Sequence, residues 1–384
     1  MGCRHGLATR AREKMVSPPD FEPEITVSLS PETIAALPKV VLHDHLDGGL
    51  RASTVFEIAQ EIGHPLPADD PDALATWFYA SAESGTLVDY LETFVHTIAV
   101  MQTAAHLERV AREWVVDLAA DGVVYGEARW APEQHTAGGL TLRQAVAAVG
   151  AGLRAGMADA AASGTPMVAR QLVTSLRHTP PSREVADLAR FGADDLVVGF
   201  DLAGPEDGFP AGGHHETFAY LADHLVPVTI HAGEAAGVAS IAGAIAERAL
   251  RLGHGARLVE DIAPDGDGWS LGPVATWVRD RRIPLELSPT SNLQTGVCAT
   301  VAEHPFGLLE RLGFVVTVNC DNRLMSRTSP SREMGLLVDA FGYDLADLRR
   351  FTVDAARAGF LPHPERERLV ADVIEPGYAA ASEG

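Results

Sequence analysis

Short apolar runs of strand length alternate with longer helical patterns along nearly the whole chain. Strands that are covered by helices on both faces of a parallel sheet are expected to be almost continuously apolar. Eight such runs separated by helices are typical of a closed (β/α)8 barrel, so we predict an α/β protein with this fold. The eight runs cover residues 38–45, 123–129, 168–173, 197–201, 226–231, 252–254, 284–288 and 314–321.

The segment between the first and second runs is much longer than a barrel connection requires. Apolar residues recur there at three- and four-residue spacing over 53–62 and 89–117, which predicts extra helices between the first two strands. Further helices are predicted over 142–162 and 183–190. A doubly wound open sheet is the alternative, but no glycine-rich phosphate loop follows the first run, which disfavours it.

The first 30 residues differ in composition from the rest of the chain. They mix basic residues with prolines and carry no apolar stretch of signal-peptide type, which predicts a disordered tail over 1–30. A transit peptide is the alternative for this stretch, and Met15 is an alternative start. We predict that residues 31–384 form a single barrel domain.

Charge and cysteine content exclude several classes of function. The formal net charge is -22, from 30 Lys and Arg against 52 Asp and Glu, which argues against nucleic-acid and membrane partners. Three cysteines without paired spacing indicate neither a disulfide framework nor a cysteine-based zinc site. We therefore expect a cytoplasmic protein that acts on a small molecule; the oligomeric state stays open.

Ionisable residues stand at the downstream ends of these runs, where parallel α/β folds place their sites. His43 and His45 are two residues apart, so both imidazoles project from one face of a strand. His231 and Asp321 follow two later runs in the same position. Three imidazoles and one carboxylate form a nitrogen-rich ligand set that suits zinc. Each of these histidines by itself is more often an ordinary hydrogen-bonded residue, so the prediction depends on the joint pattern.

Six motifs, in this order along the chain, resemble the signature blocks of the adenosine deaminase family. The resemblance covers about residues 37 to 361 and implies an eight-stranded barrel with one zinc ion that removes ammonia hydrolytically from a 6-aminopurine nucleoside. The blocks are His43-Asp44-His45-Leu46-Asp47-Gly48, Asp201-Leu202-Ala203-Gly204, His231-Ala232-Gly233-Glu234, Leu252-Gly253-His254-Gly255, Ser288-Pro289-Thr290-Ser291-Asn292 and Asn319-Cys320-Asp321-Asn322.

The resemblance also implies catalytic roles. Glu234 would give a proton to the purine ring, and burial would raise its pKa for that task. The alternative for Glu234 is a carboxylate that merely stabilises a helix N-terminus. His254 would lie beside the attacking water, orient it and accept its proton, while Asp321 would both bind zinc and accept a hydrogen bond from the water.

Four residues are implied in substrate binding. Asp47, expected on the same strand face as His45, would bond the ribose 5′ hydroxyl, and His45 would face the substrate as well as the metal. The Gly204 N–H would meet purine N3, although an ordinary turn glycine is the alternative. Asn322 stands where the family commonly has an aspartate, and its amide would donate to purine N7 directly.

We therefore expect a zinc-dependent enzyme of purine metabolism that converts adenosine and 2′-deoxyadenosine to inosine and ammonia. The alternatives are a deaminase of adenine or of a 5′-modified adenine nucleoside, and a catalytically silent protein that binds zinc and nucleoside. Five apolar residues between the first two strands form either a lid over the purine or ordinary helical packing, and His178 is expected to be a solvated loop residue. The five are Phe78, Leu87, Tyr90, Leu91 and Phe94.

Overall fold

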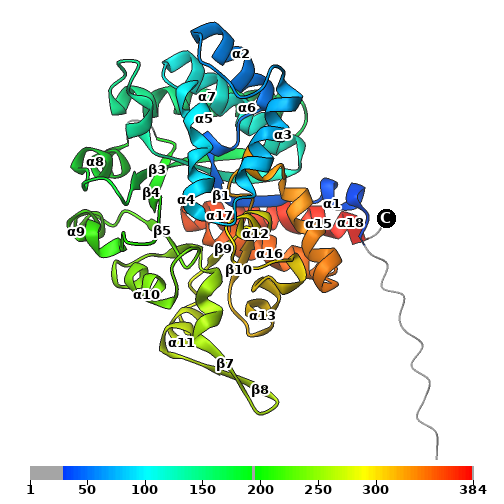
Figure 1. Ribbon diagram of the computed structural model, residues 1–384. Helices are drawn as coiled ribbons and strands as arrows, with labels where there is room; N and C mark the ends of the chain where they lie inside the picture. Colours follow the sequence, from blue (N-terminus) through cyan, green and yellow to red (C-terminus); the bar gives the residue numbers. More distant parts are fainter. Residues whose placement is uncertain (1–28, 193–194, 383–384) are drawn as a thin grey trace, which may run out of the picture.

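The computed structural model describes residues 29–192 and 195–382. Eight parallel strands form one sheet in the order β1-β2-β3-β4-β5-β6-β9-β10, with helices around its outside (Figure 1). This arrangement confirms the predicted (β/α)8 fold. The strands are β1 Lys39–His45, β2 Val123–Trp130, β3 Val168–Leu176, β4 Val197–Ala203, β5 Val228–Ala232, β6 Arg251–His254, β9 Leu285–Leu287 and β10 Val316–Val318.

The first and last strands meet at a seam that consists of site residues. The Asp321 N–H donates to the His43 carbonyl at 3.0 Å, and the His45 N–H donates to the Asp321 carbonyl at 2.7 Å. The side-chain oxygen of Asn319 accepts hydrogen bonds from the N–H groups of Leu42 and His43, both at 3.0 Å. The ends of β1 and β10 are therefore held together at the point where three of the predicted metal ligands lie.

Charged side chains fill part of the barrel interior. Arg251 donates to Glu127 at 2.6 Å and to Glu286 at 2.6 Å, and Arg129 donates to Glu286 at 2.7 Å. All four side chains are fully or almost fully buried. Buried charges are tolerated only when they are paired and hydrogen-bonded, so each of these four residues depends on its partners.

The predicted extra helices lie between β1 and β2. They are α2 Ala52–Ile62, α3 Pro71–Ala82, α4 Leu87–Glu92, α5 Phe94–Ala99 and α6 Ala104–Ala120. The single helical segment predicted over 89–117 is wrong, because the chain forms three helices there. The break before α6 has a local cause: Thr103 is extended and its side chain accepts a hydrogen bond from the His106 N–H, which starts a new helix. The helix α3 was not predicted.

The remaining elements cover the outside of the barrel. The helix α7 begins and ends as predicted, and α8 is one residue longer than predicted. The antiparallel hairpin of β7 Ile262–Asp265 and β8 Gly268–Leu271 was not predicted and projects from the barrel (Figure 1). The helices are α1 Pro31–Ala36, α7 Leu142–Ala162, α8 Arg183–Phe191, α9 His215–Asp223, α10 Val238–Ala246, α11 Pro273–Asp280, α12 Pro289–Gln294, α13 Phe306–Arg311, α14 Arg323–Ser326, α15 Pro330–Phe341, α16 Leu345–Ala358, α17 His363–Leu369 and α18 Glu375–Ser382.

Two predictions concern the chain outside this core. Residues 1–28 of the predicted tail lie outside the described residues, and the predicted domain boundary at residue 31 stays a prediction. Among the described residues, no helix is both long and apolar enough to cross a membrane.

Candidate active site

A cavity of about 630 Å³ opens at the carboxyl ends of the barrel strands. All but one of the residues predicted to bind metal or substrate, or to act in catalysis, contribute to its lining; the exception is His43, which is fully buried in β1. The residues from the strand ends are His45, Asp47, Gly204, His231, Glu234, His254, Asp321 and Asn322.

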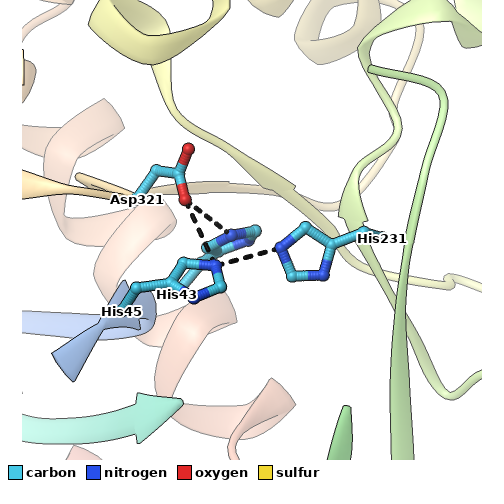
Figure 2. Close-up of side chains that lie close together, drawn as sticks. All are labelled: His43, His45, His231 and Asp321. Atoms are coloured by element: carbon cyan, nitrogen blue, oxygen red, sulfur yellow. Dashed lines mark hydrogen bonds and ion pairs between the residues drawn. The ribbon is translucent and has the colours of Figure 1, made fainter. Parts of the chain in front are cut away.

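The four predicted metal ligands converge on one point (Figure 2). The Nε2 atom of His43 lies 3.2 Å from Oδ1 of Asp321, and that of His45 lies 3.4 Å from the same oxygen. The Nε2 atoms of His45 and His231 are 3.1 Å apart. One ligand atom from each of the four residues lies within 4.8 Å of the others. Sequence spacing predicted only the pairing of His43 with His45, whereas the tertiary structure brings all four together.

The electrostatics of this group fit a divalent cation. Burial lowers the pKa of His45 to about 3, so its ring is neutral and carries a lone pair. Burial opposes the charge on Asp321, but its hydrogen bond with His43 and the charge of that ring hold the pKa of Asp321 well below its usual value. Neutral imidazoles and an ionised carboxylate are the protonation states that a zinc site requires.

Two of these rings have a carboxylate on their far side. The Nδ1 atom of His43 lies 3.2 Å from Glu286, and that of His231 lies 3.1 Å from Asp201 and 3.1 Å from the Leu202 carbonyl oxygen. Such partners fix the ring orientation and leave Nε2 for the metal. The sequence analysis gave neither carboxylate this role. The available signal was an acidic residue inside an otherwise apolar strand, at Asp201 and at Glu286.

Two site residues adopt a backbone conformation that residues with side chains rarely take. His254 has φ 62° and Asp321 has φ 61°. The left-handed region is unfavourable for residues other than glycine, asparagine and aspartate, and such strain concentrates at functional sites. At both residues the strand has just ended, and the left-handed turn gives the side chain a direction that continued strand geometry would not give.

Glu234 lies in a loop whose backbone is held by a second carboxylate. Both oxygens of Glu206 accept backbone N–H groups: Oε1 that of Gly233 at 2.6 Å, and Oε2 those of Glu234, Ala235 and Ala236 at 3.0, 2.8 and 2.9 Å. Glu206 comes from the loop after β4, two residues beyond Gly204. One buried side chain therefore fixes the loop of the predicted proton donor to the loop of a predicted substrate contact. The sequence analysis did not identify Glu206.

The surroundings of Glu234 favour its protonated form. Burial raises the pKa of Glu234 well above its usual value, and the negative charges of Asp321 and Glu206 raise it further. A carboxyl group that keeps its proton near neutral pH is able to act as a general acid. The macrodipole alternative does not describe this residue, because Glu234 precedes the first residue of α10 by four positions.

His254 lies opposite Glu234 across the same part of the cavity. Its Nε2 atom is 3.4 Å from Oε2 of Glu234, and one ligand atom each of His254, Glu234 and Asp321 lies within 4.8 Å of the others. Burial and the neighbouring His43 ring lower the pKa of His254 well below its usual value. The ring is therefore neutral.

The predicted substrate residues line the other side of the cavity. Asp47 does not extend β1 as predicted but lies in a 3-10 turn, Leu46–Gly48, because the strand ends at His45. Its Oδ1 is buried without a hydrogen-bond partner within the described chain. Gly204 has φ 97°, and a Cβ there would lie 3.1 Å from Nδ1 of His178, so glycine is required. Asn322 packs against Gly48, where a Cβ would lie only 1.8 Å from its Oδ1.

Most of the predicted lid residues face the cavity. Leu87, Tyr90, Leu91 and Phe94 line it from α4 and α5, whereas Phe78 is completely buried in the core beside Trp77. The apolar side chains of these two short helices thus form one wall of the cavity. His178, predicted only as an exposed loop residue, is exposed but also lines the cavity next to Gly204.

A (β/α)8 barrel with three imidazoles and a carboxylate at the carboxyl ends of its strands defines the class of metal-dependent hydrolases. The chain matches the adenosine deaminase family model over residues 38–376. It is 55% identical over 359 residues to an adenosine deaminase of Mycobacterium sp. strain KMS, which covers 92% of this chain and 99% of the relative. The chain belongs to the adenosine deaminase family, whose members are hydrolytic enzymes.

Solved structures show the same fold at lower sequence identity. An amidohydrolase of Burkholderia ambifaria with bound zinc is 23% identical, with a TM-score of 0.79 over 95% of this chain and 96% of that one. An adenine deaminase of Arthrobacter aurescens is 22% identical, with a TM-score of 0.75 over 91% of this chain and 100% of that one. At these identities the likeness supports the barrel and says nothing of this chain's substrate.

Proposed function

We propose that the protein hydrolyses adenosine and 2′-deoxyadenosine to inosine and ammonia with one zinc ion per chain. The observation that carries the proposal is the position of Glu234, a buried carboxyl group with a raised pKa, beside a group of three histidines and one aspartate. Few reactions other than hydrolytic substitution on a basic ring need a metal-activated water and a proton donor at neighbouring points.

The ligands that would hold zinc are His43, His45, His231 and Asp321. When bound, the ion would lower the pKa of a water molecule and so supply a nucleophile at neutral pH. Asp201 and Glu286 would keep the rings of His231 and His43 oriented. The chemistry of the donor set supports zinc over magnesium or calcium, because imidazole nitrogen outnumbers carboxylate oxygen.

The protein residues would manage the protons. Glu234 gives its proton to the ring nitrogen next to the attacked carbon, which makes that carbon electrophilic without leaving a full negative charge on the ring. Water adds its oxygen to the carbon and loses one proton, and the amino group receives a proton and leaves as ammonia. The hydroxyl formed on the carbon returns its proton to Glu234. Asp321 and His254 lie where they would flank the water.

Three contacts support a purine nucleoside as the substrate. The unpartnered Oδ1 of Asp47 is an acceptor for a ribose hydroxyl, because a buried carboxylate oxygen without a donor is costly. The Gly204 N–H would donate to purine N3, and the Asn322 amide would donate to N7. His45 lines the cavity and would contact the substrate as well as the metal. The apolar wall formed by Leu87, Leu91 and Phe94 would cover the base.

Two further candidates stay open to the same experiment. A deaminase of free adenine or of a 5′-modified nucleoside would not use the Asp47 contact, since neither ligand offers a 5′ hydroxyl. A catalytically silent protein that binds zinc and nucleoside would be expected to lack a ligand or a proton donor, and this chain has both. A cytoplasmic location and a role in purine salvage remain predictions.

The test is the ultraviolet change that accompanies conversion of adenosine to inosine. The purified protein is assayed as prepared, after removal of its metal by a chelator, and after zinc is restored. We expect the activity to disappear and return. Adenosine, 5′-deoxyadenosine and adenine are then compared on the same zinc-loaded protein, and faster turnover of adenine than of adenosine would reject the nucleoside proposal. Inactive but fully zinc-loaded protein would favour the silent alternative.

A further inference from the structure

Behind His254 lies a short chain of buried polar side chains that the proposed function does not use. Nδ1 of His254 is 3.0 Å from the amide nitrogen of Asn292, and the amide oxygen of Asn292 is 3.1 Å from Nε2 of His304. The Phe306 N–H donates to Nδ1 of His304 at 3.0 Å. All three side chains are at most 3% exposed, so water does not compete for these contacts.

The direction of every hydrogen bond in this chain follows from its fixed end. A backbone N–H is always a donor, so Nδ1 of His304 must be the acceptor. Burial lowers the pKa of His304 to about 3, so the ring is neutral and its one proton is on Nε2. That N–H needs an acceptor, which places the Asn292 oxygen toward His304. The Asn292 NH2 group then faces His254.

His254 receives the consequence of this order. Because the Asn292 NH2 group donates to Nδ1, a proton on Nδ1 would place two donors against each other at 3.0 Å. A neutral imidazole carries its proton on one nitrogen only, so it must be on Nε2. Nε2 is the atom that faces Glu234 and the cavity.

We propose that Asn292 and His304 are positioning residues that hold His254 as the neutral tautomer with its proton on Nε2, so that His254 donates a hydrogen bond at the reacting oxygen and does not accept the water proton. This refines the proposed function and rests on it for the role in catalysis, although the tautomer itself does not. The water proton then has to pass to a group other than His254. Asp321 is the ionised carboxylate that lies within 4.8 Å of both His254 and Glu234.

The tautomer is read directly by ¹⁵N NMR of zinc-loaded protein labelled at histidine, because protonated and unprotonated ring nitrogens have well-separated shifts. The His254 signals are assigned by their loss in His254→Ala. We expect a protonated Nε2 and an unprotonated Nδ1 in the unaltered protein. A proton on Nδ1 would overturn the proposal, whatever the activity of the protein.

Two variants test the source of the tautomer. In Asn292→Asp the carboxylate only accepts, so it takes a proton from each neighbouring ring; we expect His254 to move its proton to Nδ1 and turnover to fall about 100-fold at full zinc occupancy. In His304→Gln the amide oxygen accepts from Phe306 and the amide nitrogen donates to Asn292. We expect this variant to keep both the Nε2 proton and the turnover.

The outcomes separate the two proposals. If Asn292→Asp leaves the proton on Nε2 and the turnover unchanged, the relay does not set the tautomer and the inference is wrong. If His304→Gln shifts the proton to Nδ1, the deduced bond directions are wrong. If the unaltered protein does not deaminate adenosine but shows the Nε2 proton, the proposed function fails and the tautomer assignment stands.

Discussion

Asp201→Asn is expected to weaken zinc binding without removing any ligand. The Asp201 carboxylate lies 3.1 Å from Nδ1 of His231, accepts a hydrogen bond from Thr174 at 3.2 Å and is 3.7 Å from Arg129. Although burial opposes ionisation, the charges of His231 and Arg129 hold the pKa of Asp201 below its usual value, so it is a carboxylate at neutral pH. The substitution removes that charge and keeps the shape.

The expected magnitude follows from what the variant retains. Loss of a carboxylate behind a metal-binding histidine typically costs 10- to 100-fold in metal affinity. Here the Leu202 carbonyl oxygen is a second acceptor for the same Nδ1 at 3.1 Å, so the ring keeps its orientation. We therefore expect the lower end of the range, about tenfold, which corresponds to about 1.4 kcal/mol.

Competition with a chromogenic chelator at fixed pH measures this affinity. Thr174→Val is the matched control, because it removes the other hydrogen bond to Asp201 and keeps the charge; its zinc affinity should equal that of the unaltered protein. Thermal unfolding of the metal-free proteins shows whether either change disturbs the fold. Asp201→Asn protein that binds zinc as tightly as the unaltered protein would refute the reasoning, since the Leu202 carbonyl would then suffice alone.

Three further predictions concern catalysis and substrate binding. Glu234→Gln should keep its zinc, measured by metal analysis, and lose at least about 100-fold in turnover; near-normal turnover would remove Glu234 as the proton donor. Because the pKa of Glu234 is raised, its proton is present below that pKa and is lost as pH rises through it. Glu206→Gln removes a negative neighbour, so the alkaline limb of the kcat/KM profile should move to lower pH, and an unmoved limb would contradict this. Gly48→Ala should displace Asn322 and raise KM for adenosine, with no such effect from Gly63→Ala, where a Cβ meets open space.

Local sequence patterns were sufficient for the barrel and for the identity of the metal group. Strand and helix periods are set by short-range geometry, so eight buried runs were visible without tertiary information. The strand ends carried the ionisable residues, and their common position in a parallel barrel brought His231 and Asp321 to the pair His43 and His45.

The failures of the sequence analysis have specific causes. The segment 89–117 kept a helical period through Thr103, but a threonine side chain that caps one helix ends the previous one. Asp47 was placed on the strand because period-two spacing does not reveal where a strand ends. Asp201, Glu206 and Glu286 were not given roles, because the partner of each lies on another strand or loop, 22 or more residues away.

The sequence by itself determined which chemical groups this protein has, their order along the strands and the family to which it belongs, because these depend on residue type and local period. Only the tertiary structure decided how those groups act. The raised pKa of Glu234, the carboxylates behind His43 and His231, and the bond directions that lead to His254 depend on burial and on contacts between distant segments. Burial and through-space electrostatics are properties of the packed chain, and no local pattern encodes them.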